Sequence, residues 1–85
     1  MDSISNIVSE IVSEAGGKDG EQVTEELNAR LGEAGHTPLK VVKTGNIDKR
    51  QNDSCPSGVE ACEEYKVDHG DGTFSDPWWG PWFCF

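Results

Sequence analysis

The side chains best suited to chemistry gather at the carboxyl end of this chain. Residues 74–85, FSDPWWGPWFCF, contain all three tryptophans, all three phenylalanines and one of the three cysteines. Enzymes that work on indole rings or thiols could use such a segment, and a chain end is where modification and proteolytic release are easiest. The sequence therefore predicts a substrate segment with four candidate modified positions: Trp78, Trp79, Trp82 and Cys84.

Two other interpretations of this segment stay open. Pro77, Gly80 and Pro81 exclude a helix or a central strand, because proline lacks an amide donor and has a fixed φ. The segment could fold back so that its indoles pack on an N-terminal helix and form the core. It could also be an interfacial anchor, since tryptophan suits the boundary between lipid headgroups and hydrocarbon.

Patterns for metal binding and catalysis are weak elsewhere. Cys55, Cys62, His69 and Cys84 form a nominal Cys3His set, but their spacing is not that of a zinc knuckle. The acids of residues 68–74 do not fall at the positions of a calcium-binding loop. Each of the two histidines lies alone in glycine-containing sequence. We expect no metal, no cofactor and no enzymatic activity.

The cysteine count predicts free thiols. Three is an odd number, and the amino-terminal sequence lacks the positive region of a signal peptide. Disulfides are rare in the cytoplasm, where we therefore place the chain. Cys55 and Cys62 could close a small loop after secretion.

Two helices are expected in the first third of the chain. The first, at about 3–15, carries an apolar stripe at helical spacing, with Asp2 or Ser3 as its cap and Gly16–Gly17 as its end. The second, at about 20–32, has fewer apolar residues along its stripe. The stripe residues are Ile4, Ile7, Val8, Ile11 and Val12 in the first helix, and Val23, Leu27 and Leu31 in the second.

The remaining sequence predicts little order. A single strand is expected at 38–43, and it must pair with another copy, with residues 65–67 or with a partner's sheet edge. Hydrophobic residues make up 34% of the chain and the net charge is -9, a combination that favours disorder. We expect a mostly disordered chain with two short helices and no large core. The charge also disfavours nucleic acid and anionic membranes, and no stretch is long enough to span a membrane.

The layout resembles that of a precursor of a ribosomally synthesised and post-translationally modified peptide. The resemblance implies a leader at 1–45, an acidic flexible linker at 46–67 and a Trp-rich core peptide at 68–85. A maturation enzyme would bind the leader through the first helix and the strand, that is, through Ile4, Ile7, Val8, Ile11, Val12, Leu39, Val41 and Val42. The tail would then reach the active site at high effective concentration.

The resemblance also implies a modification of the core peptide, its release by a protease and its export. Halogenation or oxidation of tryptophan is favoured among the modifications that indoles accept. A protease or a peptidase-containing transporter would release the core, which could leave the cytoplasm after maturation. Gly16–Gly17 resembles the cleavage site of such transporters, although a helix end explains the pair more simply.

Two rival functions come from other classes. The chain could be a small interaction subunit whose Trp78, Trp79 and Trp82 insert into a larger protein complex as hot-spot anchors. It could also be an exported antimicrobial polypeptide cleaved after Gly17. Altered tryptophan masses would support the precursor. An unmodified chain in a stable complex would support the interaction subunit, and an N-terminus at Lys18 would support the exported polypeptide.

Overall fold

Two helices form close to the ranges that the apolar spacing predicts. The computed structural model describes residues 3–85 and contains α1 at Ile4–Ser13 and α2 at Gly20–Glu33. The hydroxyl of Ser3 accepts a hydrogen bond from the amide of Asn6 at 3.1 Å, and the carboxylate of Asp19 accepts one from Gln22 at 2.8 Å. Both contacts satisfy amides that a helix start leaves without partners. Asp2, the other candidate cap, lies outside the described residues.

The apolar stripes of the two helices face each other and form most of the core. Ile7, Val8 and Ile11 of α1 are buried, as are Val23, Leu27 and Leu31 of α2. Ala15 lies in the connecting loop and is fully buried. An ion pair between Glu10 and Arg30, with 2.5 Å between Oε2 and Nη2, bridges the exposed sides of the helices.

A long hairpin follows the helices and accounts for most of the sheet. Strands β1 (Lys40–Gln51) and β2 (Val59–Asp68) pair antiparallel along their whole lengths. The register shifts between Lys43 and Ile47, where Gly45 has φ +93°. This positive φ is one that glycine adopts at little cost, so Gly45 accommodates the irregularity.

The aromatic segment returns along the other edge of β2. Strand β3 (Trp78–Trp79) pairs with Glu64 and Tyr65, and strand β4 (Phe83–Cys84) pairs with Glu60 and Ala61. Pro77 and Pro81 lie just outside these short strands. The prolines therefore exclude a long central strand, as expected, but they permit two short edge pairings.

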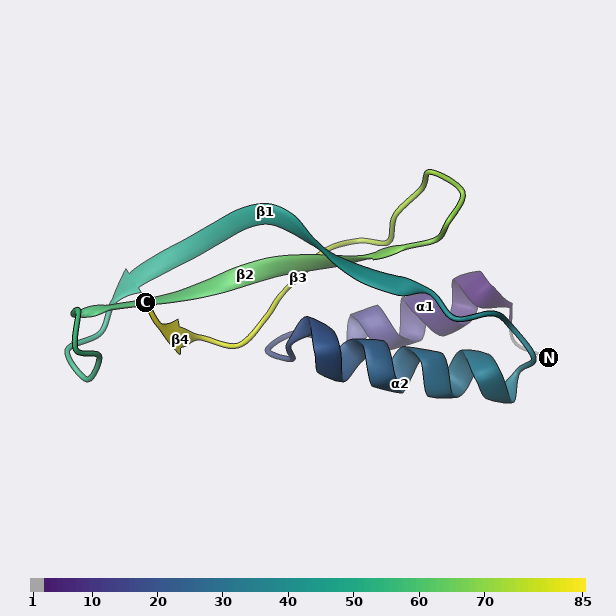
Figure 1. The fold of residues 1–85 in the computed structure, drawn as a ribbon, viewed down its shortest axis with the longest axis horizontal. Coiled ribbons are helices and arrows are strands. Elements are labelled where there is room, and N and C mark those ends of the chain that lie inside the picture. The colour runs from purple at the N-terminus through teal and green to yellow at the C-terminus, as the bar shows by residue number, and fades with distance from the viewer. Residues whose placement is uncertain (1–2) are drawn as a thin grey trace.

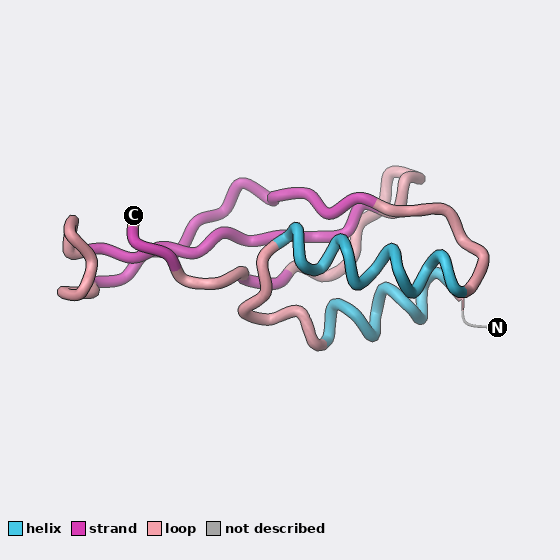
Figure 2. Tube along the Cα trace, turned by 60° about the horizontal axis from the view of Figure 1, so that its bottom comes forward, coloured by secondary structure: helices cyan, strands magenta, loops and turns pink. Residues whose placement is uncertain are grey.

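The helices cover only one end of this sheet (Figures 1 and 2). The hairpin extends beyond them, and the β1–β2 loop and the C-terminus lie at its far end (Figure 1). The molecule is consequently elongated, with extents of 48 × 23 × 16 Å. Val67 and Trp78 are the buried sheet residues of the helical core, and the partly buried Val41 and Tyr65 pack against it. Among residues 3–85, no helix is both long enough and apolar enough to cross a membrane.

The expectation of a mostly disordered chain was wrong. Residues 46–67, expected as flexible linker, form most of the hairpin. The strand expected at 38–43 overlaps the start of β1 at residues 40–43, and β1 continues to Gln51. Disorder was inferred from low apolar content, but this hairpin has few buried positions to fill. Its second partner is the aromatic segment, which arrives from a distant part of the sequence. Such pairing leaves no local signal.

Candidate functional site: the C-terminal aromatic segment

Trp78 is a core residue. Its side chain is 5% exposed and stacks on Tyr65, with 5.8 Å between ring centroids and 27° between planes. The indole Nε1 donates a hydrogen bond to the carbonyl oxygen of Lys18 at 3.1 Å. Of the four candidate modified positions, this one would need local opening before an enzyme could reach its ring.

Tyr65, which the sequence did not single out as a site residue, holds the aromatic segment against the helices. A Cβ at Gly20 would lie 2.8 Å from Cδ1 of the Tyr65 ring, and a Cβ at Gly80 would lie 2.7 Å from Cε2. Only glycine leaves room for the ring at both places. The amide of Gly17 also donates to the carbonyl of Trp79 at 2.9 Å. The segment is therefore fixed to the loop between the helices.

Trp79 and Trp82 remain accessible. Trp79 is 39% exposed, although its backbone is paired in β3. Trp82 is half-buried, and the guanidinium of Arg50 lies 3.9 Å from its ring centre. A cation in this position is attracted by the negative face of the ring. Arg50 was not a predicted site residue, and only the sheet register brings it to the tail.

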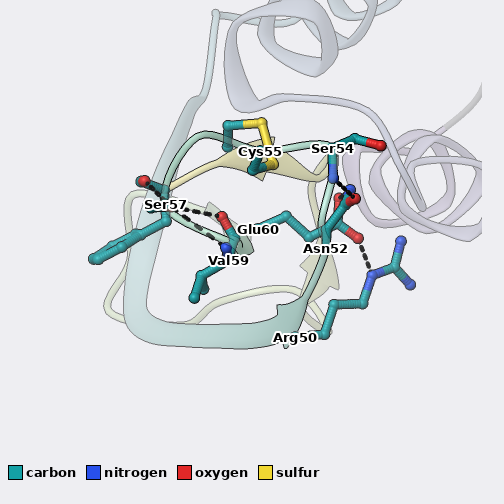
Figure 3. Close-up of a disulfide and its surroundings, with 9 residues drawn as sticks. Arg50, Asn52, Ser54, Cys55, Ser57, Val59 and Glu60 are labelled. Atoms are coloured by element: carbon teal, nitrogen blue, oxygen red, sulfur yellow. Dashed lines mark hydrogen bonds and ion pairs between the residues drawn. A yellow bond between two sulfur atoms is a disulfide. The ribbon is translucent and has the colours of Figure 1, made fainter.

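Cys84 forms a disulfide with Cys55, contrary to the expectation of free thiols (Figure 3). The two Cα atoms are 5.3 Å apart, a usual separation for a disulfide. Pairing of β4 with β2 brings Cys84 back to the β1–β2 loop that carries Cys55. In this structure the Cys84 thiol is consequently not available as a modifiable group.

Several polar contacts fix the far end of the hairpin. The amide of Phe85 donates to the carbonyl of Val59 at 3.0 Å, and the hydroxyl of Ser57 donates to the carbonyl of Phe85 at 2.8 Å. Glu60 is buried and accepts hydrogen bonds from Asn52 and Arg50 (Figure 3). These contacts, the one from Asn52 above all, hold the pKa of the Glu60 carboxyl below its usual value.

Three large apolar side chains lie exposed on the part of the hairpin that the helices leave uncovered. The register places Ile47 opposite Glu63, Phe83 opposite Ala61, and Phe85 next to Val59. Alternate residues of a strand share a face, so these three side chains belong to one face of the sheet. Their exposed fractions are 51%, 41% and 59%, respectively. We call Ile47, Phe83 and Phe85 the distal face.

A separate groove lies between the aromatic segment and the end of α1. Its volume is about 770 Å³, and all three tryptophans line it, with Val12 and Pro81. Asp48 and Cys62, which are cross-strand partners, also line this space. Cys62 is the one free cysteine among residues 3–85, and burial raises the pKa of its thiol, so it stays protonated at neutral pH. We call this space the indole groove.

The predicted leader contacts are divided between core and surface. Ile7, Val8 and Ile11 are buried between the helices, while Ile4 is 37% exposed. Val12, Leu39 and Val41 are half-buried against the core, and Val42 is half-buried in β1. Burial within the domain leaves most of the α1 stripe unavailable to another protein.

No group of three metal-ligating side chains occurs among residues 3–85. His69 instead forms a hydrogen bond through Nδ1 with the hydroxyl of Thr73 at 2.9 Å, and Cys55 and Cys84 are bonded to each other. The members of the nominal Cys3His set thus have other partners or, in the case of Cys62, lie buried in the sheet.

Comparison with known protein families, curated proteins and solved structures gives no match for this chain.

Proposed function

We propose that this chain is a binding module without catalytic activity, and that its distal face anchors it to a partner protein. The observation that supports this most directly is the exposure of Ile47, Phe83 and Phe85 on one face of a sheet. The proposal keeps the idea of a small interaction subunit. It moves the anchors from the three tryptophans to the residues that the fold leaves uncovered.

The distal face has the properties of an anchor. Large exposed apolar side chains that gather in one place favour association with another protein, because burying them removes apolar surface from water. The backbone that carries them is held by β4 pairing, by the Cys55–Cys84 disulfide and by the Ser57 contact. A surface ordered in advance loses less conformational entropy on binding.

The rim of this face also suits an interface. The ammonium group of Lys49 lies 4.0 Å from the centre of the Phe85 ring, and Lys49 is the cross-strand neighbour of Ala61 beside Phe83. An apolar centre with a charged edge is the usual composition of a non-obligate interface. The cation at the edge would favour a partner with acidic groups around its pocket.

Site-specific photocrosslinking in the native host tests this function. A photoreactive residue in place of Phe85 should form a discrete adduct with one protein, whereas the same residue in place of Glu25, exposed on α2, should not. Phe83→Ala should weaken that adduct at least tenfold without changing the fold. Phe74→Ala is the matched control, because Phe74 is also exposed but pairs with Asp68 away from the distal face.

Three results would contradict the proposal. The first is an absence of any adduct from position 85 in cells that contain the folded chain. The second is an adduct that Phe83→Ala and Phe74→Ala weaken equally. An adduct of twice the chain mass would identify a second copy as the partner and would also contradict anchoring to a different protein.

We also propose, as a second candidate, the modified-peptide precursor whose layout this chain resembles. Trp79 is 39% exposed and Trp82 is half-buried, so both indoles are accessible without global unfolding. A maturation enzyme would then bind a folded leader rather than a flexible one, and would halogenate or oxidise the indoles. Release by a protease or a peptidase-transporter would follow.

Mass spectrometry of the chain recovered from its host separates the two candidates. The precursor predicts added mass on Trp79 or Trp82 in preference to the buried Trp78, together with a cleaved product. An intact, unmodified chain present at the same time as the crosslinked adduct would contradict the precursor and support the binding module.

A further inference from the structure

We propose that the indole groove binds an arginine side chain from a basic segment of the partner protein. The inference deepens the proposed binding function and rests on it, since it names the chemistry that the partner presents beside the distal face. Its residues differ from those of the distal face, so the two surfaces can be tested independently.

The composition of the groove suits a guanidinium. Its walls combine indole rings, of which Trp79 is the most exposed, with the carboxylate of Asp48. Indole faces attract cations, and a carboxylate supplies the opposite charge. A guanidinium is planar, so it can stack on a ring and also donate two hydrogen bonds to a carboxylate, which an ammonium cannot do.

The charge of the groove also suits a cation. Asp48 forms no ion pair with any lysine or arginine among residues 3–85, and its Oδ1 accepts a hydrogen bond from the backbone amide of Lys49 at 3.0 Å. Burial raises the pKa of the Cys62 thiol beside it and keeps that thiol neutral, so Asp48 is the charged group among the residues that line the groove. The whole chain carries a net charge of -9, which attracts a basic segment from a distance.

The aromatic segment already binds one guanidinium within the molecule. Arg50 stacks on Trp82 at 3.9 Å and pairs with Glu60, which is an indole and a carboxylate acting together on one arginine. Arg50 does not line the indole groove. The lining of the groove contains the same two kinds of group, the Trp79 indole and the Asp48 carboxylate, and no arginine.

An NMR titration of the intact chain with the capped tripeptide Gly-Arg-Gly tests the inference. The indole Nε1–H signals of Trp79 and Trp82 should shift and saturate. The Gly-citrulline-Gly peptide has the same shape without the charge and should bind at least tenfold more weakly. Asp48→Asn should weaken arginine binding about tenfold, whereas Asp53→Asn, in the exposed β1–β2 loop outside the groove, should leave it unchanged.

Three results would overturn the inference: no saturable shift with the arginine peptide, equal binding of the citrulline peptide, or no effect of Asp48→Asn in a variant whose spectrum shows the native fold. Equal binding of the two peptides would indicate a groove for neutral apolar segments. Each of these can occur while the crosslink at position 85 persists, which would remove the groove from the proposal and leave the distal-face anchor intact. Saturable arginine binding without a crosslink would instead contradict the distal-face function alone.

Discussion

Three tryptophans within five residues of one another occupy three different environments. Trp78 is buried against Tyr65, Trp79 is partly exposed beside the groove, and Trp82 lies under the Arg50 guanidinium. A cluster that looks uniform in the sequence therefore has one structural member and two accessible ones. The same division explains why Trp78 is a poor substrate position and why binding chemistry is assigned to the other two.

At the residue scale, the packing around Tyr65 can be tested by adding single methyl groups. Gly20→Ala and Gly80→Ala each place a Cβ within 2.8 Å of the Tyr65 ring, and should lower the free energy of unfolding by about 1–3 kcal/mol. Gly32→Ala meets no atom within 4 Å in α2 and should instead stabilise by about 0.5–1 kcal/mol. Urea unfolding measures all three. Equal effects at Gly20 and Gly32 would show that the ring is not confined.

The environment of Glu60 makes a pH-dependent prediction. Hydrogen bonds from Asn52 and Arg50 hold the pKa of Glu60 below its ordinary value of 4.5. The unfolded chain therefore takes up a proton at higher pH than the folded chain does. The stabilisation from Glu60 is complete above about pH 4.5 and is lost as the pH falls through the folded-state pKa.

Glu60→Gln should accordingly be less stable than the wild-type chain at pH 7, and the difference should shrink below pH 4.5. Urea unfolding from pH 7 to pH 3 measures this change. Glu25→Gln, on the exposed side of α2, controls for the loss of one negative charge. A pH profile that Glu25→Gln reproduces would contradict the assignment to Glu60.

At the scale of elements, β4 is the least supported part of the sheet. It has two residues, and the hairpin it joins extends beyond the helices (Figure 1). The Cys55–Cys84 disulfide compensates for the small number of ladder hydrogen bonds. It closes a sequence separation of 29 residues, so it also removes conformational freedom from the unfolded chain.

Removing this disulfide should lower the free energy of unfolding by about 3–4 kcal/mol, from the loop-closure entropy alone. Cys55→Ala/Cys84→Ala should keep the helices and lose amide-exchange protection at Phe85. Reductant should lower the urea midpoint of the wild-type chain. The midpoint of Cys62→Ala should respond equally, because that variant keeps the disulfide. An unchanged midpoint on reduction would show that β4 is held by other contacts.

At the scale of the whole molecule, a confined helical core supports a hairpin that projects beyond it. The Cα radius of gyration is 14.6 Å, while a spherical chain of this length would have about 12 Å and an unfolded one about 29 Å. The projecting end carries the distal face, and the junction with the helices carries the indole groove. One elongated body thus presents two separate surfaces to a partner.

Small-angle scattering distinguishes this shape from the disordered chain that composition predicts. The folded protein should give a radius of gyration near 15 Å and one cooperative urea transition. A value approaching 29 Å without denaturant would contradict the fold and, with it, both proposed surfaces. Scattering in 6 M urea supplies the reference for the unfolded chain.

Strand β2 has a recognisable pattern in the sequence, but the acidic composition of the segment hides it. Val59, Ala61, Tyr65 and Val67 occupy alternate positions of β2, with Glu63 as the one polar residue in that series. Alternation of this kind is the period of a half-buried strand. The acids between them and the overall charge made this segment resemble a linker. By contrast, nothing in the cysteine spacing favours Cys55–Cys84 over the other two pairings that three cysteines allow.

The sequence alone predicts the two helices and Ser3 as a candidate cap of the first, because apolar spacing and hydrogen bonds over three residues are local properties. It also determined that the aromatic segment could not form a long central strand, since proline acts at its own position. The return of that segment along β2 could be seen only in the folded chain. From this return follow the burial of Trp78, the disulfide and the two exposed surfaces, because strand pairing between distant residues depends on how the whole chain packs.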